Sequence, residues 1–220
     1  MSPRITFEKE LVMLCRHVEE MARQVEANYE ALFDAFTKKD EEKLRRLEKV
    51  DKEINRKQRE IESECLFLIT KQQPVVGDLR LVTAGLKAVT DIERIGDHVA
   101  DMAELLLRMD LQDLDKYSVH LFPMEEAAKK MLHMAVNAFV NRDTQAAHKV
   151  IDTDDVVDEL FNRVKEDIVD ALKKEAKDAD MCIDAMMLAK YLEKIGDHAV
   201  NIGEWTIFRE TGNVNNIRVL

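Results

Sequence analysis

The chain repeats one six-residue phrase after one hundred residues. Residues 93–98 read Glu-Arg-Ile-Gly-Asp-His, and residues 193–198 read Glu-Lys-Ile-Gly-Asp-His. A near-copy at this distance indicates that the chain consists of two similar halves. We therefore expect two domains, at residues 1–113 and 114–220.

Glycine and proline are sparse, and this favours long helices. Neither residue occurs between positions 4 and 73, or between positions 124 and 195. A single helix of 70 residues would be about 105 Å long, too long for a compact domain. Each block must therefore fold back on itself. The predicted hinges are residues 38–40 and 141–143, where Asp40 and Asp143 can cap the helices that follow.

These boundaries predict an all-α protein with six helices in two sets of three. The first set spans residues 6–37, 41–71 and 77–108, and the second spans residues 119–141, 144–175 and 180–209. Apolar residues recur at helical spacing, as at Leu11, Leu14 and Val18, and predict a buried stripe. The tail at residues 211–220 has no periodicity, so we expect a frayed end.

Charge and cysteine content bound the possible partners and location. The net charge is −11 and the pI about 5.1, which argues against a nucleic-acid partner and against anionic lipid. It suits cations or a basic protein surface. No apolar stretch is long enough for membrane insertion. Cys15, Cys65 and Cys182 form no CxxC pair, so we expect buried free thiols in a cytoplasmic protein.

The repeated phrase places several acids on one helix face. At 100° per residue, Asp97 and Asp101 lie about 40° and 80° from Glu93, and Glu104 lies between them. The second half places Glu193 and Asp197 in the same way, with Asn201 at the position of Asp101. Like charges four residues apart destabilise a helix, so a compensating cation is expected.

A second, shorter pattern precedes each acidic stripe. Asp51 and Asn55 form a pair of side-chain oxygens four residues apart, and so do Asp154 and Asp158. If the middle and third helices pack side by side, each half gathers four or five oxygens, which suits Mg²⁺, Mn²⁺ or iron. A solvated acidic face paired with Arg94 or Lys194 is an equally weighted alternative.

The remaining residues of the phrase suggest supporting roles. Glycine within a helix costs about 1 kcal/mol relative to alanine. Its recurrence at Gly96 and Gly196 therefore predicts a close helix approach beside the acidic face. His98 and His198 are candidates for groups that flank a metal site, or for ordinary surface histidines.

The paired phrases resemble those of the PhoU family of bacterial phosphate-uptake regulators. Residues 73–80, Gln-Pro-Val-Val-Gly-Asp-Leu-Arg, are also similar to that family, and the resemblance covers nearly the whole chain. It implies two tandem three-helix bundles related by pseudo-twofold symmetry. It also implies a non-enzymatic, cytoplasmic negative regulator of phosphate uptake and of the phosphate regulon, usually a homodimer. Such a protein would link the ATPase subunit of the phosphate ABC transporter to a sensor histidine kinase.

The same resemblance implies multinuclear metal clusters containing iron, zinc, manganese or magnesium. The implied ligands are Asp51, Glu93, Asp97 and Asp101 in the first half, and Asp154, Asp158, Glu193, Asp197 and Asn201 in the second. The halves differ because Asn55 and Asn201 supply neutral oxygens at different places. Alternative functions are a metalloenzyme on a carboxylate cluster, an accessory regulator of another phosphate carrier, and a purely structural dimerisation module.

Overall fold

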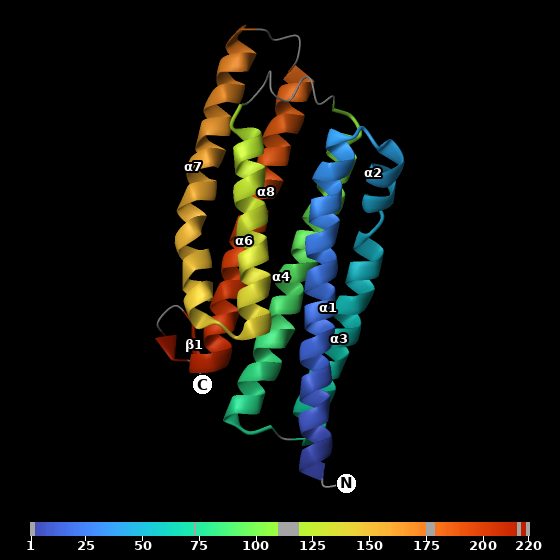
Figure 1. Ribbon diagram of the computed structural model, residues 1–220, viewed down its shortest axis with the longest axis vertical. Helices are drawn as coiled ribbons and strands as arrows, with labels where there is room; N and C mark the ends of the chain where they lie inside the picture. The colour runs from blue at the N-terminus through green and yellow to red at the C-terminus, as the bar shows by residue number, and fades with distance from the viewer. Residues whose placement is uncertain (1–2, 73, 110–118, 175–178, 215–216, 219–220) are drawn as a thin grey trace.

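The computed structural model describes residues 3–72, 74–109, 119–174, 179–214 and 217–218, which form two helical bundles side by side (Figure 1). The first bundle contains α1 (Pro3–Thr37), α2 (Glu41–Leu47), α3 (Asp51–Gln72) and α4 (Val76–Leu106). The second contains α6 (Leu121–Asn141), α7 (Thr144–Lys174) and α8 (Ala179–Thr211). The prediction of an all-α protein with two tandem bundles is confirmed.

The two predicted hinges have the same structure. Lys39 and Arg142 adopt left-handed backbone conformations, with φ of 56° and 57°. The Lys43 amide donates to Asp40 Oδ1 at 2.9 Å, and the Ala146 amide donates to Asp143 Oδ1 at 2.9 Å. Each aspartate therefore satisfies an otherwise unpaired amide of the first helical turn, as the sequence predicted.

The predicted helix at residues 41–71 is wrong, because the chain divides it into α2 and α3. Between them, the Lys49 amide bonds to the Arg46 carbonyl and the Val50 amide to the Leu47 carbonyl, each at 3.1 Å. These three-residue spacings tighten the backbone into a turn. The turn lets buried Leu44 and Leu47 pack in the core ahead of α3. No glycine or proline marks this position, so local sequence gave no signal.

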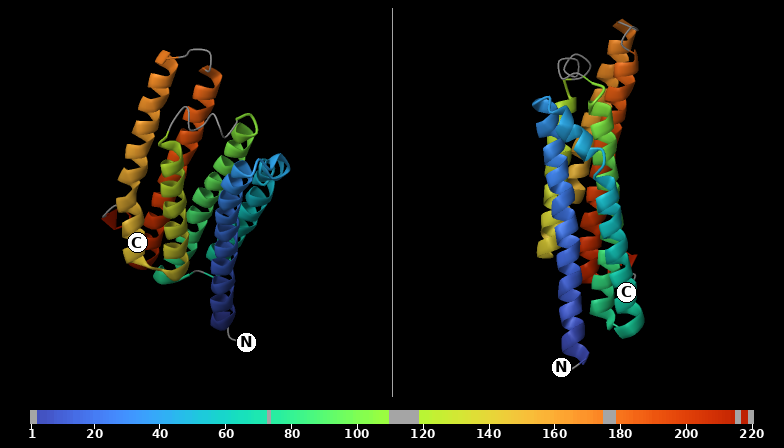
Figure 2. Two further views of the ribbon diagram at one scale, coloured as in Figure 1. Left: turned by 45° about the horizontal axis from the view of Figure 1, so that its top comes forward. Right: turned by 90° about the vertical axis from the view of Figure 1, so that its right-hand side faces the viewer.

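The bundles meet mainly along α4 and α8, with a smaller contact between α1 and α6. Figures 1 and 2 show α4 and α8 in the middle of the molecule and α3 and α7 toward its two sides. The His98 and His198 rings lie 5.7 Å apart at this junction. His98 also stacks near Tyr191, and His198 contacts Asp91. The 100-residue repeat makes Asp91 equivalent to Tyr191 and His98 equivalent to His198. The pairs His98–Tyr191 and His198–Asp91 are therefore related by the pseudo-twofold symmetry.

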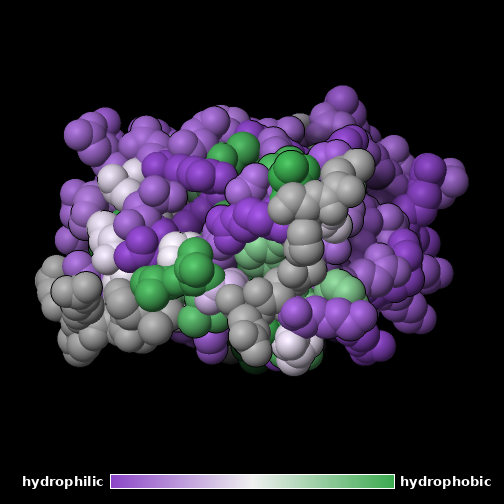
Figure 3. Space-filling model, turned by 90° about the horizontal axis from the view of Figure 1, so that it is seen from below, coloured by the Kyte–Doolittle hydropathy of each residue, from purple (hydrophilic) through white to green (hydrophobic). Residues whose placement is uncertain are grey.

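The C-terminal tail contains more structure than predicted. Residues Asn213–Val214 (β1) and Ile217–Arg218 (β2) pair as antiparallel strands, so the expected frayed end is wrong for these described residues. The domain boundary predicted at 113/114 lies outside the described residues. The end of the molecule seen from below is mostly hydrophilic, with isolated hydrophobic groups (Figure 3). Among the helices described, none is both long and apolar enough to cross a membrane.

Candidate metal centre

Close packing of α3 on α4 brings Asp51, Asp97 and Asp101 of the first predicted set into one groove, whereas Glu93 does not line it. A Cβ at Gly96 would lie 3.1 Å from Cγ2 of Ile54, so glycine permits the observed approach of the two helices. Beside this contact is a cavity of about 410 Å³, here called the acidic groove. Its polar lining residues are Glu48, Asp51, Asn55, Asp97, Asp101 and Glu104. The predicted close approach beside the acidic face is confirmed for this half.

The carboxylates of this half interact with one another. Burial, followed by the charge of Asp97, raises the pKa of Glu93. Burial is also the main cause that raises the pKa of Asp97, with Asp51 adding to it against the opposing charge of Arg94. Burial raises the pKa of Asp101, and Asp97 and Glu104 raise it further. Crowded carboxylates with raised pKa values are a favourable environment for a cation.

Among Asn55 and the predicted ligands of this half, two oxygen atoms are buried without a hydrogen-bond partner in the described part of the chain. They are Glu93 Oε2 and Asn55 Oδ1. The Glu93 side chain is 11% exposed, and Arg94 Nε lies 3.6 Å from Oε2, beyond hydrogen-bonding distance. Buried acceptors without donors are unfavourable. These atoms therefore have the chemistry that a hard cation would satisfy.

The second half gathers Asp154, Asp158, Glu193 and Asp197, here called the second acidic cluster. A Cβ at Gly196 would lie 3.6 Å from Asp154 Oδ1, which places α7 directly against α8. Burial and the neighbouring Asp158 and Asp197 raise the pKa of Asp154 to about 6. Burial and then Glu193 and Asp197 raise the pKa of Asp158. All four carboxylates are therefore mutual neighbours.

Basic side chains partly neutralise the carboxylates. Lys190 Nζ lies 2.7 Å from Glu193 Oε2, and Lys194 Nζ lies 2.5 Å from Asp197 Oδ2. Arg94 makes a longer contact of 3.4 Å with Asp97. Across the described part of the chain, no three carboxylate, imidazole or thiol side chains converge closely enough to hold one ion. The alternative of an acidic face paired with Arg94 or Lys194 is therefore realised in part.

Asn201 does not join the second acidic cluster. Its Nδ2 donates to Asp91 Oδ1 on α4 at 2.9 Å. His198 Nδ1 lies 2.9 Å from the same oxygen, and Trp205 Nε1 donates to Asp91 Oδ2 at 3.2 Å. The structure thus groups Asn201 with a buried network that joins α4 to α8. Sequence reasoning missed Asp91, because its three partners lie more than one hundred residues away.

The residue equivalent to Asp91 in the second half is Tyr191, and it has different partners. The Tyr191 hydroxyl interacts with Asp101 at the edge of the acidic groove. Burial and the neighbouring His198 lower the pKa of His98 to about 4, so His98 is neutral at pH 7. Its Nδ1 is buried, accepts or donates no hydrogen bond among the residues that the structure describes, and lies 4.0 Å from Asp101 Oδ2. Both histidines lie between the two sets of carboxylates rather than within either set.

The groove contains two glutamates that the predicted ligand set omitted. Glu48 precedes Asp51 by three residues, and Glu104 lies one turn beyond Asp101 on α4. Glu104 was already visible as a member of the acidic stripe. Glu48 could not be placed from sequence, because the turn between α2 and α3 decides its position.

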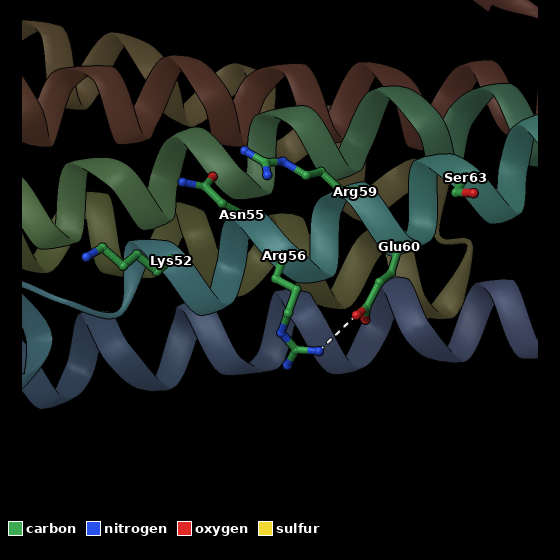
Figure 4. A pocket seen from close by; sticks show the side chains of 6 residues that line it. All are labelled: Lys52, Asn55, Arg56, Arg59, Glu60 and Ser63. Carbon is green, nitrogen blue, oxygen red and sulfur yellow. Dashed lines mark hydrogen bonds and ion pairs between the residues drawn. The ribbon is translucent and has the colours of Figure 1, made fainter.

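The outward face of α3 has the opposite charge. A shallow pocket of about 620 Å³ is lined by Lys52, Asn55, Arg56, Arg59, Glu60 and Ser63, all from α3 (Figure 4). The only ion pair drawn there joins Arg56 to Glu60 at 2.8 Å. Three basic groups and one acid make this surface unsuitable for a metal cation. Of these two pockets beside α3, the acidic groove is therefore the one with cation-binding chemistry.

Comparison with known proteins establishes the family of the chain. The sequence model of the PhoU domain matches twice, over residues 18–106 and 122–206. The chain belongs to the PhoU family. The two matches lie one in each bundle, which confirms the resemblance inferred from the repeated phrases.

Two curated PhoU relatives align over most of the chain. The "phosphate-specific transport system accessory protein PhoU homolog" of Clostridium acetobutylicum is 31% identical over 210 residues, covering 95% of this chain and 96% of that protein. A Burkholderia protein of the same name is 30% identical over 205 residues, covering 92% of this chain and 87% of that protein.

Solved PhoU structures have the same fold. The phosphate transport system regulatory protein PhoU from Streptococcus pneumoniae superposes with a TM-score of 0.87 at 25% identity, covering 96% of this chain and all of that chain. PhoU from Pseudomonas aeruginosa gives 0.86 at 27% identity, covering 94% and 100%. The two curated relatives are named as accessory proteins and the Streptococcus pneumoniae protein as a regulatory protein, in agreement with the non-enzymatic prediction.

Proposed function

We propose that this PhoU-family chain is a metal-binding negative regulator of phosphate uptake. The observation that carries the metal part is the pair of buried oxygens, Glu93 Oε2 and Asn55 Oδ1, that accept no hydrogen bond from any described residue. They lie in a half whose carboxylates have raised pKa values. A bound cation would satisfy both the unpaired acceptors and the crowded negative charge.

The proposed ligands come from two helices in each half. Asp51, Glu93, Asp97 and Asp101 would hold metal between α3 and α4, and Asp154, Asp158, Glu193 and Asp197 would hold it between α7 and α8. The side chains must turn toward one another to enclose an ion, and Lys194 must release Asp197. Carboxylate and amide oxygens suit magnesium, manganese or iron, and carboxylates also bind zinc. Asn201 is left out of the set, because its amide is held by Asp91.

The regulatory part of the proposal rests on the names of the relatives and on the family resemblance. The relatives are accessory proteins of a phosphate-specific transport system. We infer that this chain acts in the cytoplasm as a homodimeric adaptor between the transporter ATPase and a sensor histidine kinase. Its lack of a helix able to cross a membrane, within the described residues, is compatible with docking on the ATPase subunit.

Elemental analysis of the purified protein tests the metal sites. We expect wild type to retain metal, Asp97→Asn to lose the share bound in the first half, and Asp197→Asn to lose the share in the second. Asp170→Asn is the matched control, because Asp170 is an exposed carboxylate on α7 that pairs with Lys173. Unchanged metal content in both site variants, with folding intact by circular dichroism, would contradict the proposal.

Pull-down experiments test the partners separately. The tagged chain should recover the phosphate transporter ATPase and the sensor kinase from cells, with recovery that depends on phosphate supply. Recovery of neither protein at any phosphate concentration would reject the adaptor role. That result would leave the metal analysis unaffected, so the two parts of the proposal can fail independently.

A further inference from the structure

Arg209, near the end of α8, is a buried cation that contacts the other bundle. Its side chain is 5% exposed. Nη2 donates to Sγ of Cys15 on α1 at 3.3 Å, and Nη1 donates to the Phe139 carbonyl at the end of α6 at 3.4 Å. The guanidinium also lies over the Phe139 ring, with Cζ 5.5 Å from the ring centroid. Arg209 therefore joins α1, α6 and α8 at one end of the molecule.

The charge of Arg209 is poorly neutralised. Its ion pair with Glu210 joins Nε to Oε1 at 3.9 Å, the outer limit of such a contact, and Nε has no hydrogen-bond acceptor among the described residues. Arg142 adds a second positive charge nearby. Arginine stays charged in proteins, and a buried charge is costly unless an anion faces it. The group that Nη2 faces is the Cys15 thiol.

Cys15 differs in its surroundings from the other two cysteines. Cys15 is partly exposed, whereas Cys65 and Cys182 are buried. Burial raises the pKa of Cys65 to about 12, which keeps Cys65 as an unreactive thiol. A partly exposed thiol beside a guanidinium has the two features of a reactive cysteine, namely access and a neighbouring positive charge. The expectation that all three are small buried hydrophobes is wrong for Cys15.

We propose that Cys15 is a redox modification site whose thiolate is held by Arg209 and whose oxidant is hydrogen peroxide. The thiolate sulfur attacks one peroxide oxygen, so that an S–O bond forms as the O–O bond breaks. The other oxygen leaves as hydroxide. The sulfur is oxidised by two electrons, the peroxide is reduced, and the product is a cysteine sulfenic acid. A second thiol can reverse this modification.

Oxidation of Cys15 would affect the packing of the two bundles, because Cys15 lies where they meet. Cys15 and Arg209 are 194 residues apart in the chain, and their contact crosses from the first bundle to the second. Oxidation places an oxygen where Nη2 now donates to sulfur, so it alters a contact between the two bundles. This site uses none of the proposed metal ligands, so it is independent of the proposed regulation by metal.

Peroxide oxidation of the intact protein, followed by dimedone trapping and peptide mass spectrometry, tests the proposal without any variant. Cys65 and Cys182 act as internal controls, and free cysteine is the external standard. Free cysteine is only about 1% ionised at pH 6.5. We therefore expect labelling of Cys15 at least about tenfold faster than labelling of free cysteine at that pH, with Cys65 and Cys182 unlabelled. Cys15 labelled no faster than free cysteine would overturn the proposal.

Two substitutions separate the charge of Arg209 from its packing. Arg209→Gln should slow the labelling of Cys15 by about tenfold, whereas Arg209→Lys, which keeps a positive charge, should retain most of the rate. The surface variant Arg163→Gln is the control and should match wild type. Equal slowing in both Arg209 variants, with helicity unchanged, would contradict a thiolate held by charge. If Arg209→Gln does not fold, the labelling rate of wild-type Cys15 relative to free cysteine still tests the proposal.

Discussion

Ile54 Cγ2 lies 3.1 Å from the position that a Cβ at Gly96 would occupy. Ile54 is fully buried, and it follows the Asp51 that lines the acidic groove. In the second half, the same position of the repeat brings Val157 Cγ1 to 3.5 Å from a Cβ at Gly196. The repeated glycines therefore set how closely the two acid-bearing helices of each half approach, and the first half is the tighter.

This difference predicts opposite effects of the same substitution in the two halves. Alanine gains about 1 kcal/mol over glycine in a helix, but overpacking a core costs about 1–3 kcal/mol. We expect Gly196→Ala to raise the free energy of unfolding by about 0.5–1 kcal/mol. Gly96→Ala should lower it by about 1 kcal/mol, because buried Ile54 must move. Urea unfolding measures both, and two equal gains would show that Ile54 yields freely.

The Asp91 network should contribute more to stability than an exposed ion pair between α8 and the turn that follows α4. Asp91→Ala leaves the donors of Asn201 and Trp205, and the His198 ring, without their acceptor, so we expect a loss of roughly 2–4 kcal/mol in unfolding free energy. The control is Asp184→Ala, which removes a contact of 3.3 Å with exposed Arg108. That change should cost less than about 1 kcal/mol. Equal losses would mean that the network adds nothing beyond a surface contact.

Glu125 should make stability depend on pH. Burial, and then the charge of Glu126, raise the pKa of Glu125 to about 7, against an ordinary value near 4.5. The folded state therefore favours the neutral acid, and its contribution is complete below about pH 4.5 and lost as the pH rises through 7. Glu125→Gln should match wild type at pH 4.5 and exceed it by roughly 2–3 kcal/mol at pH 8.

The exposed neighbour gives the control for this pH dependence. Glu126→Gln should change the unfolding free energy by less than about 0.5 kcal/mol at either pH. Thermal or urea unfolding at both pH values measures the difference. If the unfolding free energy of Glu125→Gln equals that of wild type at both pH values, ionisation of the Glu125 carboxyl does not destabilise the folded protein.

Removing one acid from the second acidic cluster should have opposite effects with and without metal. The pKa of Asp154, raised to about 6 by burial and neighbouring acids, shows that its charged form is disfavoured at pH 8. With a chelator present, Asp154→Asn should therefore be more stable than wild type by about 1 kcal/mol, after allowance for solvent screening.

Added metal should reverse this order, because an ion that binds only the folded state stabilises wild type more. Thermal unfolding with a chelator and with added Mg²⁺, Mn²⁺ or Fe²⁺ measures both states. Asp170→Asn should follow wild type in each. A variant that is less stable than wild type even in chelator would mean that Asp154 already has a stabilising partner without metal.

Much of the site could be predicted because its members are local in sequence. Glu93, Asp97 and Asp101 share a face through helical periodicity alone, and the duplication supplied Glu193 and Asp197. The hinges at Asp40 and Asp143 were also predictable, because a cap acts within three residues. Glu48 was not predictable, because its place depends on a turn stabilised by packing rather than by a glycine or proline.

By itself, the sequence determined the duplication, the helical class, the two capped hinges and the carboxylate faces, all of which follow from interactions within a few residues. Only the tertiary structure decided which surfaces meet. It placed Asn201 against Asp91 rather than in the second acidic cluster, and Arg209 against Cys15. Both contacts join residues more than one hundred positions apart. The packing of one bundle on the other brings these residues into contact, and the helical periodicity of the sequence does not predict that packing.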